Sequence, residues 1–237
     1  QNNSVVATDA DGTLWIGDVG IDTFESMLRD QVIRDQAREA LALEAREFGL
    51  SEQGSANEIA NHLYAAFENG RYPEKRCYEM MAWAFAGFSF EEAKDYARGV
   101  LKGRKLHERL HAEMGPILDW VQKESIRLRV VSASPLPVVQ AGVEFWNIAP
   151  SQVIAATPKL IGGEIAVGMA TPIPYGPGKV GALQKENPNG HLIGAFGDNV
   201  FDIEMLQRSE VPIAVRPKNR LLERHSEVPN LVELALE

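Results

Sequence analysis

The sequence predicts an α/β protein with a Rossmann-like three-layer α/β/α core, a mostly parallel sheet and a helical cap domain inserted after the first strand. Two observations lead to this prediction. Through residues 115–237, short apolar segments rich in branched residues alternate with helical patterns, as a parallel sheet requires. Residues 17–114 carry helical patterns only. We therefore expect residues 1–16 and 115–237 to form the core, and residues 17–114 to form an all-helical cap.

The composition is that of an ordinary globular protein, with 45% hydrophobic residues, 24% charged residues and a net charge of −9. Because nucleic-acid binding needs an excess of Lys and Arg, this charge argues against a nucleic-acid partner. No apolar run approaches the roughly 18 residues of a membrane span, so we expect no membrane partner either. The single cysteine, Cys77, excludes an intramolecular disulfide and is expected to be buried. The chain begins at Gln1, which is compatible with a removed signal peptide, but we expect a cytoplasmic protein.

The first strand is expected at residues 4–8, an apolar run that ends next to Asp9 and Asp11. Ligands bind beyond the carboxyl ends of strands in open α/β sheets. Two acids separated by one residue can divide the work of catalysis, because one can attack while the other moves protons. The plain alternative is a surface turn, which Asp and Gly favour in any case.

Helical patterns follow, with start and stop signals of their own. Serine and glutamate three residues apart form two capping boxes, at residues 55–58 and 89–92. The expected helical segments are 22–48, stopping at Gly49; 55 to about 70; 73 to 87; and 89 to about 103.

The α/β pattern then resumes and continues to the end of the chain. Strands are expected at residues 128–132, 153–156, 191–196 and 212–215, and a hairpin at 160–167 that turns at two glycines. Helices are expected after residue 116, at 136–146, from residue 179, at 201–208 and in the terminal segment.

Polar residues follow several of these strands. They are Asp9 with Asp11, Ser132, Lys179, and the segment from Asp198 to Asp202. Because the carboxyl ends of parallel strands meet at one edge of a sheet, we expect these groups to lie together. Crowded carboxylates need a cation, and ligands that are all oxygen atoms suit Mg²⁺.

This arrangement resembles the haloacid dehalogenase superfamily of phosphohydrolases and, within it, the phosphoserine phosphatase-like branch. The matching motifs lie in the family's order at residues 9–13, 130–134, 176–179 and 197–202. The resemblance implies a core on both sides of a helical cap. It also implies a Mg²⁺-dependent phosphomonoesterase whose partner is a small-molecule phosphate ester.

The resemblance also implies roles for the acids. Asp9 would be the nucleophile that forms an aspartyl phosphate, and Asp11 would protonate the leaving oxygen and then activate water. Mg²⁺ would be held by the carboxylates of Asp9 and Asp198 and by the backbone carbonyl of Asp11. Asp202, with Asn199 nearby, would orient Lys179 or metal-bound water.

The same resemblance places Ser132 and Lys179 on the phosphoryl oxygens. Without the other motifs, a serine at a strand end is usually a helix cap and a lysine is usually a surface group. The other residues expected at the phosphate are Gly12, Thr13 and Ala133.

Two residues bear on the substrate. Asp18 lies where phosphoserine phosphatases place a glutamate that binds the substrate amine, although an acid that serves only the turn is as common. The family's cap also supplies an arginine for the serine carboxylate, and here Met80 or Met81 takes its place. Arg76, one helical turn earlier, could substitute for that arginine, although an exposed arginine without such a role is more common.

The cap region is also rich in aromatic residues, which we expect mainly to form helix-packing core; the alternative is an apolar or cation-binding pocket. These residues are Trp15, Tyr78, Trp83, Phe85 and Phe88. The five histidines lack metal-ligand spacing, and we expect them at the surface.

Two other functions are compatible with an aspartate nucleophile. A phosphotransferase or phosphomutase of the same superfamily would pass the phosphoryl group to another hydroxyl. A receiver-like signalling domain is disfavoured, because its phosphoacceptor lies mid-chain and it has no helical insertion. The sequence leaves the oligomeric state open.

Overall fold

The centre of the fold is a six-stranded sheet in the order β3-β2-β1-β6-β7-β8, in which every pairing is parallel. The structure is a computed structural model that describes residues 3–234, so Gln1, Asn2 and residues 235–237 lie outside the described residues. The strands are β1 (Ser4–Thr8), β2 (Arg127–Pro135), β3 (Val153–Ala156), β6 (His191–Gly197), β7 (Val211–Val215) and β8 (Val232–Leu234).

Helices cover both faces of the sheet, because neighbouring residues of a strand point to opposite sides. Val6, Val130 and Val215 join the core cluster that contains residues of α6 (Met114–Lys123) and α7 (Leu136–Val143). Their neighbours Ala7, Val131 and Ala214 join a second cluster. That cluster contains residues of α8 (Gly178–Glu186), α9 (Ile203–Gln207) and α10 (Asn219–Leu222). These layers confirm the predicted α/β/α core.

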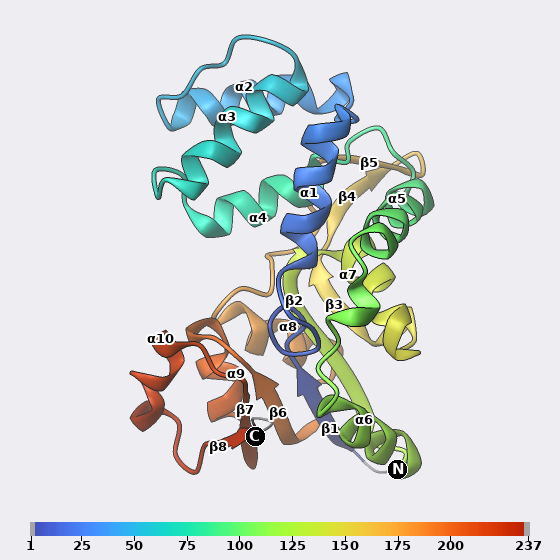
Figure 1. The fold of residues 1–237 in the computed structure, drawn as a ribbon, viewed down its shortest axis with the longest axis vertical. Coiled ribbons are helices and arrows are strands. Elements are labelled where there is room, and N and C mark those ends of the chain that lie inside the picture. Colours follow the sequence, from blue (N-terminus) through green and yellow to red (C-terminus); the bar gives the residue numbers. More distant parts are fainter. Residues whose placement is uncertain (1–2, 235–237) are drawn as a thin grey trace.

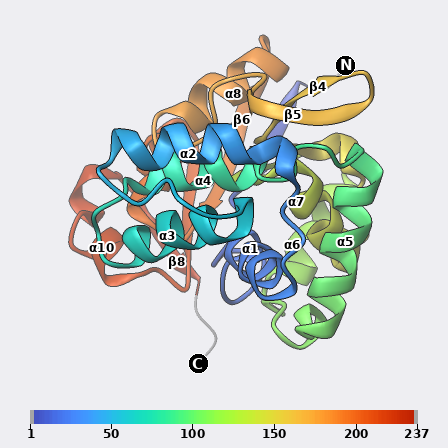
Figure 2. The same ribbon diagram turned by 90° about the horizontal axis from the view of Figure 1, so that it is seen from above.

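Residues 17–114, all of them described, form helices and loops without a strand of the sheet. Figure 1 shows α2, α3 and α4 at the top of the molecule and α5 beside α7, and Figure 2 shows the same helices from above. Both predicted capping boxes form, at Ser55 and Ser89. The helices are α1 (Val19–Asp30), α2 (Arg38–Glu47), α3 (Ala56–Glu68), α4 (Glu74–Trp83) and α5 (Phe90–Gly103).

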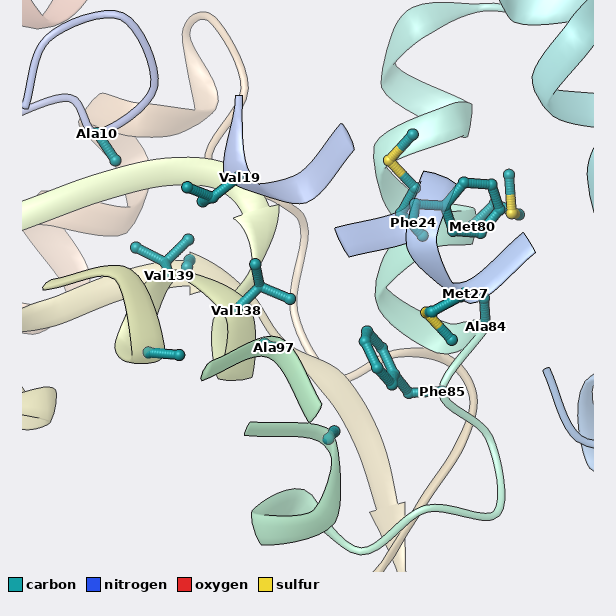
Figure 3. Close-up of a cluster of buried hydrophobic side chains, with 14 of the residues drawn as sticks. Ala10, Val19, Phe24, Met27, Met80, Ala84, Phe85, Ala97, Val138 and Val139 are labelled. Carbon is teal, nitrogen blue, oxygen red and sulfur yellow. The ribbon is translucent and has the colours of Figure 1, made fainter. Parts of the chain in front are cut away.

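One buried cluster runs through both the helical segment and the core. Figure 3 shows Val138 and Val139 of α7 near Val19 of α1, and Phe24 farther along α1 beside Met80 of α4. Because this cluster is continuous, the boundaries of a separate cap domain stay a prediction.

A two-stranded antiparallel hairpin of β4 (Pro158–Ile161) and β5 (Glu164–Met169) contacts the helical segment. It turns at Gly162 and Gly163, as predicted. The amide of Gly87 donates to the carbonyl of Ile165 (2.8 Å), and the amide of Ile165 donates to the carbonyl of Phe88 (2.7 Å). These backbone hydrogen bonds attach the hairpin to the loop before α5.

Three predictions need correction. The terminal segment contains the strand β8 besides the short α10, and an apolar pattern does not reveal β8 because it is largely exposed. The segment 22–48 contains two helices, because Gln31 adopts a left-handed conformation (φ 53°) that ends α1. His111 is buried, and its Nδ1 lies 3.0 Å from the carbonyl oxygen of Thr13. Cys77 is buried, as predicted.

Within residues 3–234, no helix combines the length and the apolar character needed to cross a bilayer.

Candidate active site

A cavity of about 330 Å³ lies at the carboxyl ends of the central strands, where the helical segment faces the sheet. It brings together most of the residues that the sequence singled out. The predicted residues that line it are Asp9, Asp11, Gly12, Asp18, Ser132, Ala133, Lys179, Asp198, Asn199 and Asp202. Thr13 lies just behind the wall and donates from Oγ1 to Asp9 Oδ2 (3.3 Å).

Asp9 and Lys179 form a buried ion pair in the floor of this cavity. Lys179 Nζ, at the start of α8, lies 2.5 Å from Asp9 Oδ1 and 2.5 Å from Asp202 Oδ1. Burial raises the pKa of the Asp9 carboxyl well above its usual value, and the nearby aspartates add to this effect, whereas Lys179 opposes it. Burial would lower the pKa of Lys179, but its two carboxylate partners outweigh burial and raise that pKa. Lys179 therefore keeps its positive charge next to Asp9, the expected nucleophile.

Asp11 is fixed by hydrogen bonds to both of its carboxylate oxygens. Oδ1 accepts from Trp15 Nε1 (2.9 Å) and from the backbone amide of Val19 (2.8 Å). Oδ2 accepts from Ser134 Oγ (2.8 Å) and Ser132 Oγ (3.2 Å). Ser132, expected on the phosphoryl group, therefore contacts the second acid in this structure. Ser134, two residues further along β2, shares this task and was not predicted.

The loop after β6 is organised by Asp202. Its Oδ2 accepts from the backbone amides of Asp198 (3.1 Å) and Asn199 (3.0 Å), while its Oδ1 holds Lys179. Asp198 in turn pairs with Lys218, whose Nζ lies 2.7 Å from Asp198 Oδ2. Burial raises the pKa of Asp198 to about 6, with Asp202 adding to the shift and Lys218 opposing it. Lys218 was not predicted from the sequence, although its position soon after β7 is a signal that could have identified it.

The carboxylates at this end of the cavity fit a divalent cation. Asp9, Asp198 and Asp202 each offer an oxygen within 4.8 Å of the others. With Asp11 they outnumber the two nearby lysines by two charges, which one divalent cation would balance. Both oxygens of Asp9 and of Asp202 already accept hydrogen bonds, so these contacts do not distinguish the two aspartates as candidate ligands. Ligands that are all oxygen atoms suit Mg²⁺.

Arg76 does not reach the cavity, which differs from the expectation that it contacts substrate. Its Nη2 lies 2.5 Å from Glu44 Oε2 and 3.0 Å from Glu47 Oε2, so both partners come from α2. Met80 and Met81 are buried. Among the described residues that line the cavity, none is an arginine.

The aromatic residues divide as the sequence suggested, with one exception. Trp15, Trp83, Phe85 and Phe88 are buried in the core, but Tyr78 of α4 lines the cavity. Three further rings that line it, those of Phe67, Tyr175 and Phe201, were not predicted. These rings come from segments far apart in the sequence, so no local pattern identifies them.

Asp18 connects the start of α1 to the cavity. Its Oδ1 caps the helix by accepting from the amide of Ile21 (2.8 Å), and its Oδ2 accepts from Tyr78 Oη (2.7 Å). Burial, together with the charge of Asp11, raises the pKa of Asp18 to about 7. Asp18 therefore serves the turn by capping α1 and also lines the cavity, while its contact with a substrate amine stays a prediction.

The family model for haloacid dehalogenase-like hydrolases matches residues 6–207. The chain belongs to this family. No curated protein matches the sequence. Among solved structures, the haloacid dehalogenase-like hydrolase described here is similar to a protein of unknown function from Bordetella pertussis Tohama I. The two share 16% identity and a TM-score of 0.75 over 100% of both chains.

Two further structures show the same fold. A functionally unknown protein from Anaerococcus prevotii DSM 20548 has 16% identity and a TM-score of 0.72, over 99% of this chain and 85% of that one. A substrate-bound phosphoserine phosphatase has 15% identity and a TM-score of 0.55, over 98% and 93% respectively. The fold of this hydrolase is therefore phosphoserine phosphatase-like.

Gly12 of the hydrolase has no room for a side chain. Its φ is +89°, and a Cβ would lie 2.1 Å from Asp198 Oδ2. We expect Gly12→Ala to displace Asp198, to lower the hydrolytic activity about 100-fold and to reduce the free energy of unfolding by about 1–3 kcal/mol. Enzyme assays and thermal unfolding check both effects. Gly99→Ala is the matched control, because a Cβ there meets nothing within 4 Å and alanine favours the helix.

Asp18 should make the stability of the hydrolase depend on pH. Its folded-state pKa of about 7 lies above the ordinary value of 3.8, so the folded chain binds more protons than the unfolded chain between these values. Its contribution to stability is therefore progressively lost as the pH rises from about 4 to about 7. Asp18→Asn keeps a capping oxygen but removes the titration. We expect melting temperatures of the wild type to fall relative to Asp18→Asn across this range; parallel pH profiles would contradict the assignment.

Proposed function

We propose that this hydrolase is a Mg²⁺-dependent phosphomonoesterase that cleaves a small organic phosphate through an aspartyl-phosphate intermediate. The observation that carries the proposal is the placement of two acids from one loop. Asp9 lies buried against Lys179, and Asp11 is held in place from both sides. The likeness of the fold to phosphoserine phosphatases supports a phosphatase.

In the first step, a carboxylate oxygen of Asp9 attacks phosphorus, and the bond between phosphorus and the ester oxygen breaks. Asp11 donates its proton to that departing oxygen, which leaves as an alcohol. In the second step, Asp11 takes a proton from water as the water oxygen attacks phosphorus. The bond between phosphorus and Asp9 then breaks, which releases inorganic phosphate and restores the carboxylate.

Cationic groups make the attack of one anion on another feasible. Lys179 supplies a fixed positive charge beside Asp9, and Ser132 supplies a hydroxyl at the cavity wall. The carboxylates of Asp9 and Asp198 and the backbone carbonyl of Asp11 would hold Mg²⁺. When bound, the ion would neutralise charge on the phosphoryl oxygens.

A transfer to a second hydroxyl gains no support from the cavity. Its described lining contains two cationic side chains, Lys179 and Lys218, and both pair with the carboxylates. A phosphomutase with a bisphosphate intermediate would need a further basic subsite.

The test is release of inorganic phosphate from a panel of phosphomonoesters, including phosphoserine, with Mg²⁺ and with a chelator. We expect turnover with Mg²⁺, loss of turnover on chelation and recovery when Mg²⁺ is added back. Turnover that the chelator leaves unchanged, or no hydrolysis of any ester, would contradict the proposal.

A further inference from the structure

Aromatic rings and further acids also line the cavity. Phe67 and Tyr78 come from the helical segment, whereas Tyr175 and Phe201 come from the core. Glu74, at the start of α4, completes this group, which we term the aromatic wall. An ester bound with its phosphate at Asp9 would direct its alcohol half towards this wall.

The rings of the aromatic wall lie close enough to act on one ligand group. The ring centroids of Tyr78 and Tyr175 are 6.4 Å apart, and those of Tyr175 and Phe201 are 4.5 Å apart. Both pairs are tilted, at 43° and 35° respectively. Faces of aromatic rings attract cations, and most strongly when water is excluded.

The two acids on this side have no cationic partner. Glu74 accepts a hydrogen bond from the Tyr175 hydroxyl, and Asp18 accepts one from the Tyr78 hydroxyl. Among the described residues, neither Asp18 nor Glu74 has a Lys, Arg or His nitrogen within 4.0 Å, the distance that defines an ion pair. Burial raises the pKa of Glu74, while the hydrogen bond from Tyr175 and then the charges of Arg220 and Lys218 oppose this rise. Half-buried acids without an ion-pair partner favour a ligand that brings a positive charge.

A carboxylate on the ligand would be disfavoured on this side of the cavity. The described lining offers it no arginine, and its only lysines pair with the aspartates at the phosphate end. Asp18 and Glu74 would repel it. This side of the cavity therefore discriminates against an amino acid and in favour of an amine alone.

We propose that the alcohol half of the substrate carries a cationic nitrogen, so that the site accepts the phosphate ester of a small amino alcohol or of its N-methylated form. This inference rests on the proposed phosphomonoesterase activity. The ammonium group would contact Tyr78 and Tyr175 while Glu74 and Asp18 balance its charge; the ring of Phe201 already has the guanidinium of Arg220 at 5.8 Å from its centroid. The cavity of about 330 Å³ has room for an ester of this size.

The test compares phosphocholine with 3,3-dimethylbutyl phosphate, in which carbon replaces the charged nitrogen at equal shape. With Mg²⁺ present, we expect kcat/KM to be at least about tenfold higher for phosphocholine. We expect phosphoethanolamine to exceed phosphoserine in the same assay. Equal rates for the charged and the neutral ester would overturn the inference while leaving the phosphatase proposal intact.

Two glutamate variants identify the source of the preference. Glu74→Gln keeps an acceptor for Tyr175 but removes the charge, so we expect the ratio of kcat/KM values for phosphocholine and its neutral analogue to fall severalfold. Glu91→Gln makes the same change at an exposed position of α5 outside the cavity, and should keep the wild-type ratio. An unchanged ratio in Glu74→Gln would overturn the role of the aromatic wall.

A binding measurement separates this inference from the chemistry. Calorimetric titration of Asp9→Asn with the same two esters needs no turnover, and we expect the charged ester to bind at least about tenfold more tightly. If this preference is found while wild type releases no phosphate, the inferred ligand class stands and the proposed reaction fails. If neither ester binds, the inferred class is wrong.

Discussion

Phosphate release by Asp9→Asn is expected to fall about 10⁴-fold or more, because an amide cannot attack phosphorus and no aspartyl phosphate can form. The change is nearly isosteric. The oxygen of the substituted amide can still accept from Lys179, so we expect the fold to persist. Steady-state assays with Mg²⁺ measure the loss, and circular dichroism confirms that the variant is folded.

A matched variant controls for the removal of one negative charge. Asp119→Asn makes the same change at an exposed position of α6, outside the cavity, and should retain wild-type activity. If Asp9→Asn kept even a tenth of the wild-type rate, another group would have to be the nucleophile.

Asp11→Asn should separate the two chemical steps. With an alkyl phosphate we expect a loss of about 10²–10⁴-fold, because the departing alkoxide needs a proton. With p-nitrophenyl phosphate, whose phenolate leaves without a proton, we expect a burst of about one p-nitrophenolate per enzyme. Turnover then stalls because an amide cannot activate water. The phosphoryl group retained on the protein is measurable by intact mass.

The contacts of Asp11 make this variant informative. An asparagine can direct its oxygen to the donors Trp15 Nε1 and Val19 N, and its NH₂ to the hydroxyl oxygens of Ser132 and Ser134. Loss of activity would therefore reflect lost proton transfer and not a displaced loop. Steady hydrolysis of p-nitrophenyl phosphate at the wild-type rate, without a burst, would contradict the role of Asp11.

Two features could be predicted from the sequence, namely the core of the fold and the proximity of Asp9 and Asp198. Both depend on short-range patterns. Asp9 follows β1 and Asp198 follows β6, and these strands are neighbours in a parallel sheet. Once the strands were recognised, their carboxyl ends had to place both acids at one edge. The roles of these residues in catalysis stay predictions until the variants are measured.

What the sequence did not predict depends on contacts between distant segments. Lys218 and Asp198 meet only through the loops after β7 and β6, and Arg76 is held away from the cavity by α2. His111 was expected at the surface because the histidines lack metal-ligand spacing, but its ring is buried, with Nδ1 3.0 Å from the carbonyl oxygen of Thr13. Local periodicity carries no information about such pairings, because side-chain partners are chosen by tertiary packing.

The hairpin's attachment to the loop before α5 has a consequence for measuring access to the active site. If the helices moved away from the sheet, the hydrogen bonds of the Gly87 and Ile165 amides would either break or move with the hairpin. In the first case, these two amide protons would exchange with solvent at the rate of separation. In the second, they would stay protected while the segment leading to Tyr175 followed the helices. Amide exchange at these two positions therefore distinguishes two motions. In one, the helical segment separates from the hairpin; in the other, the two move together and displace the part of the cavity wall that contains Tyr175.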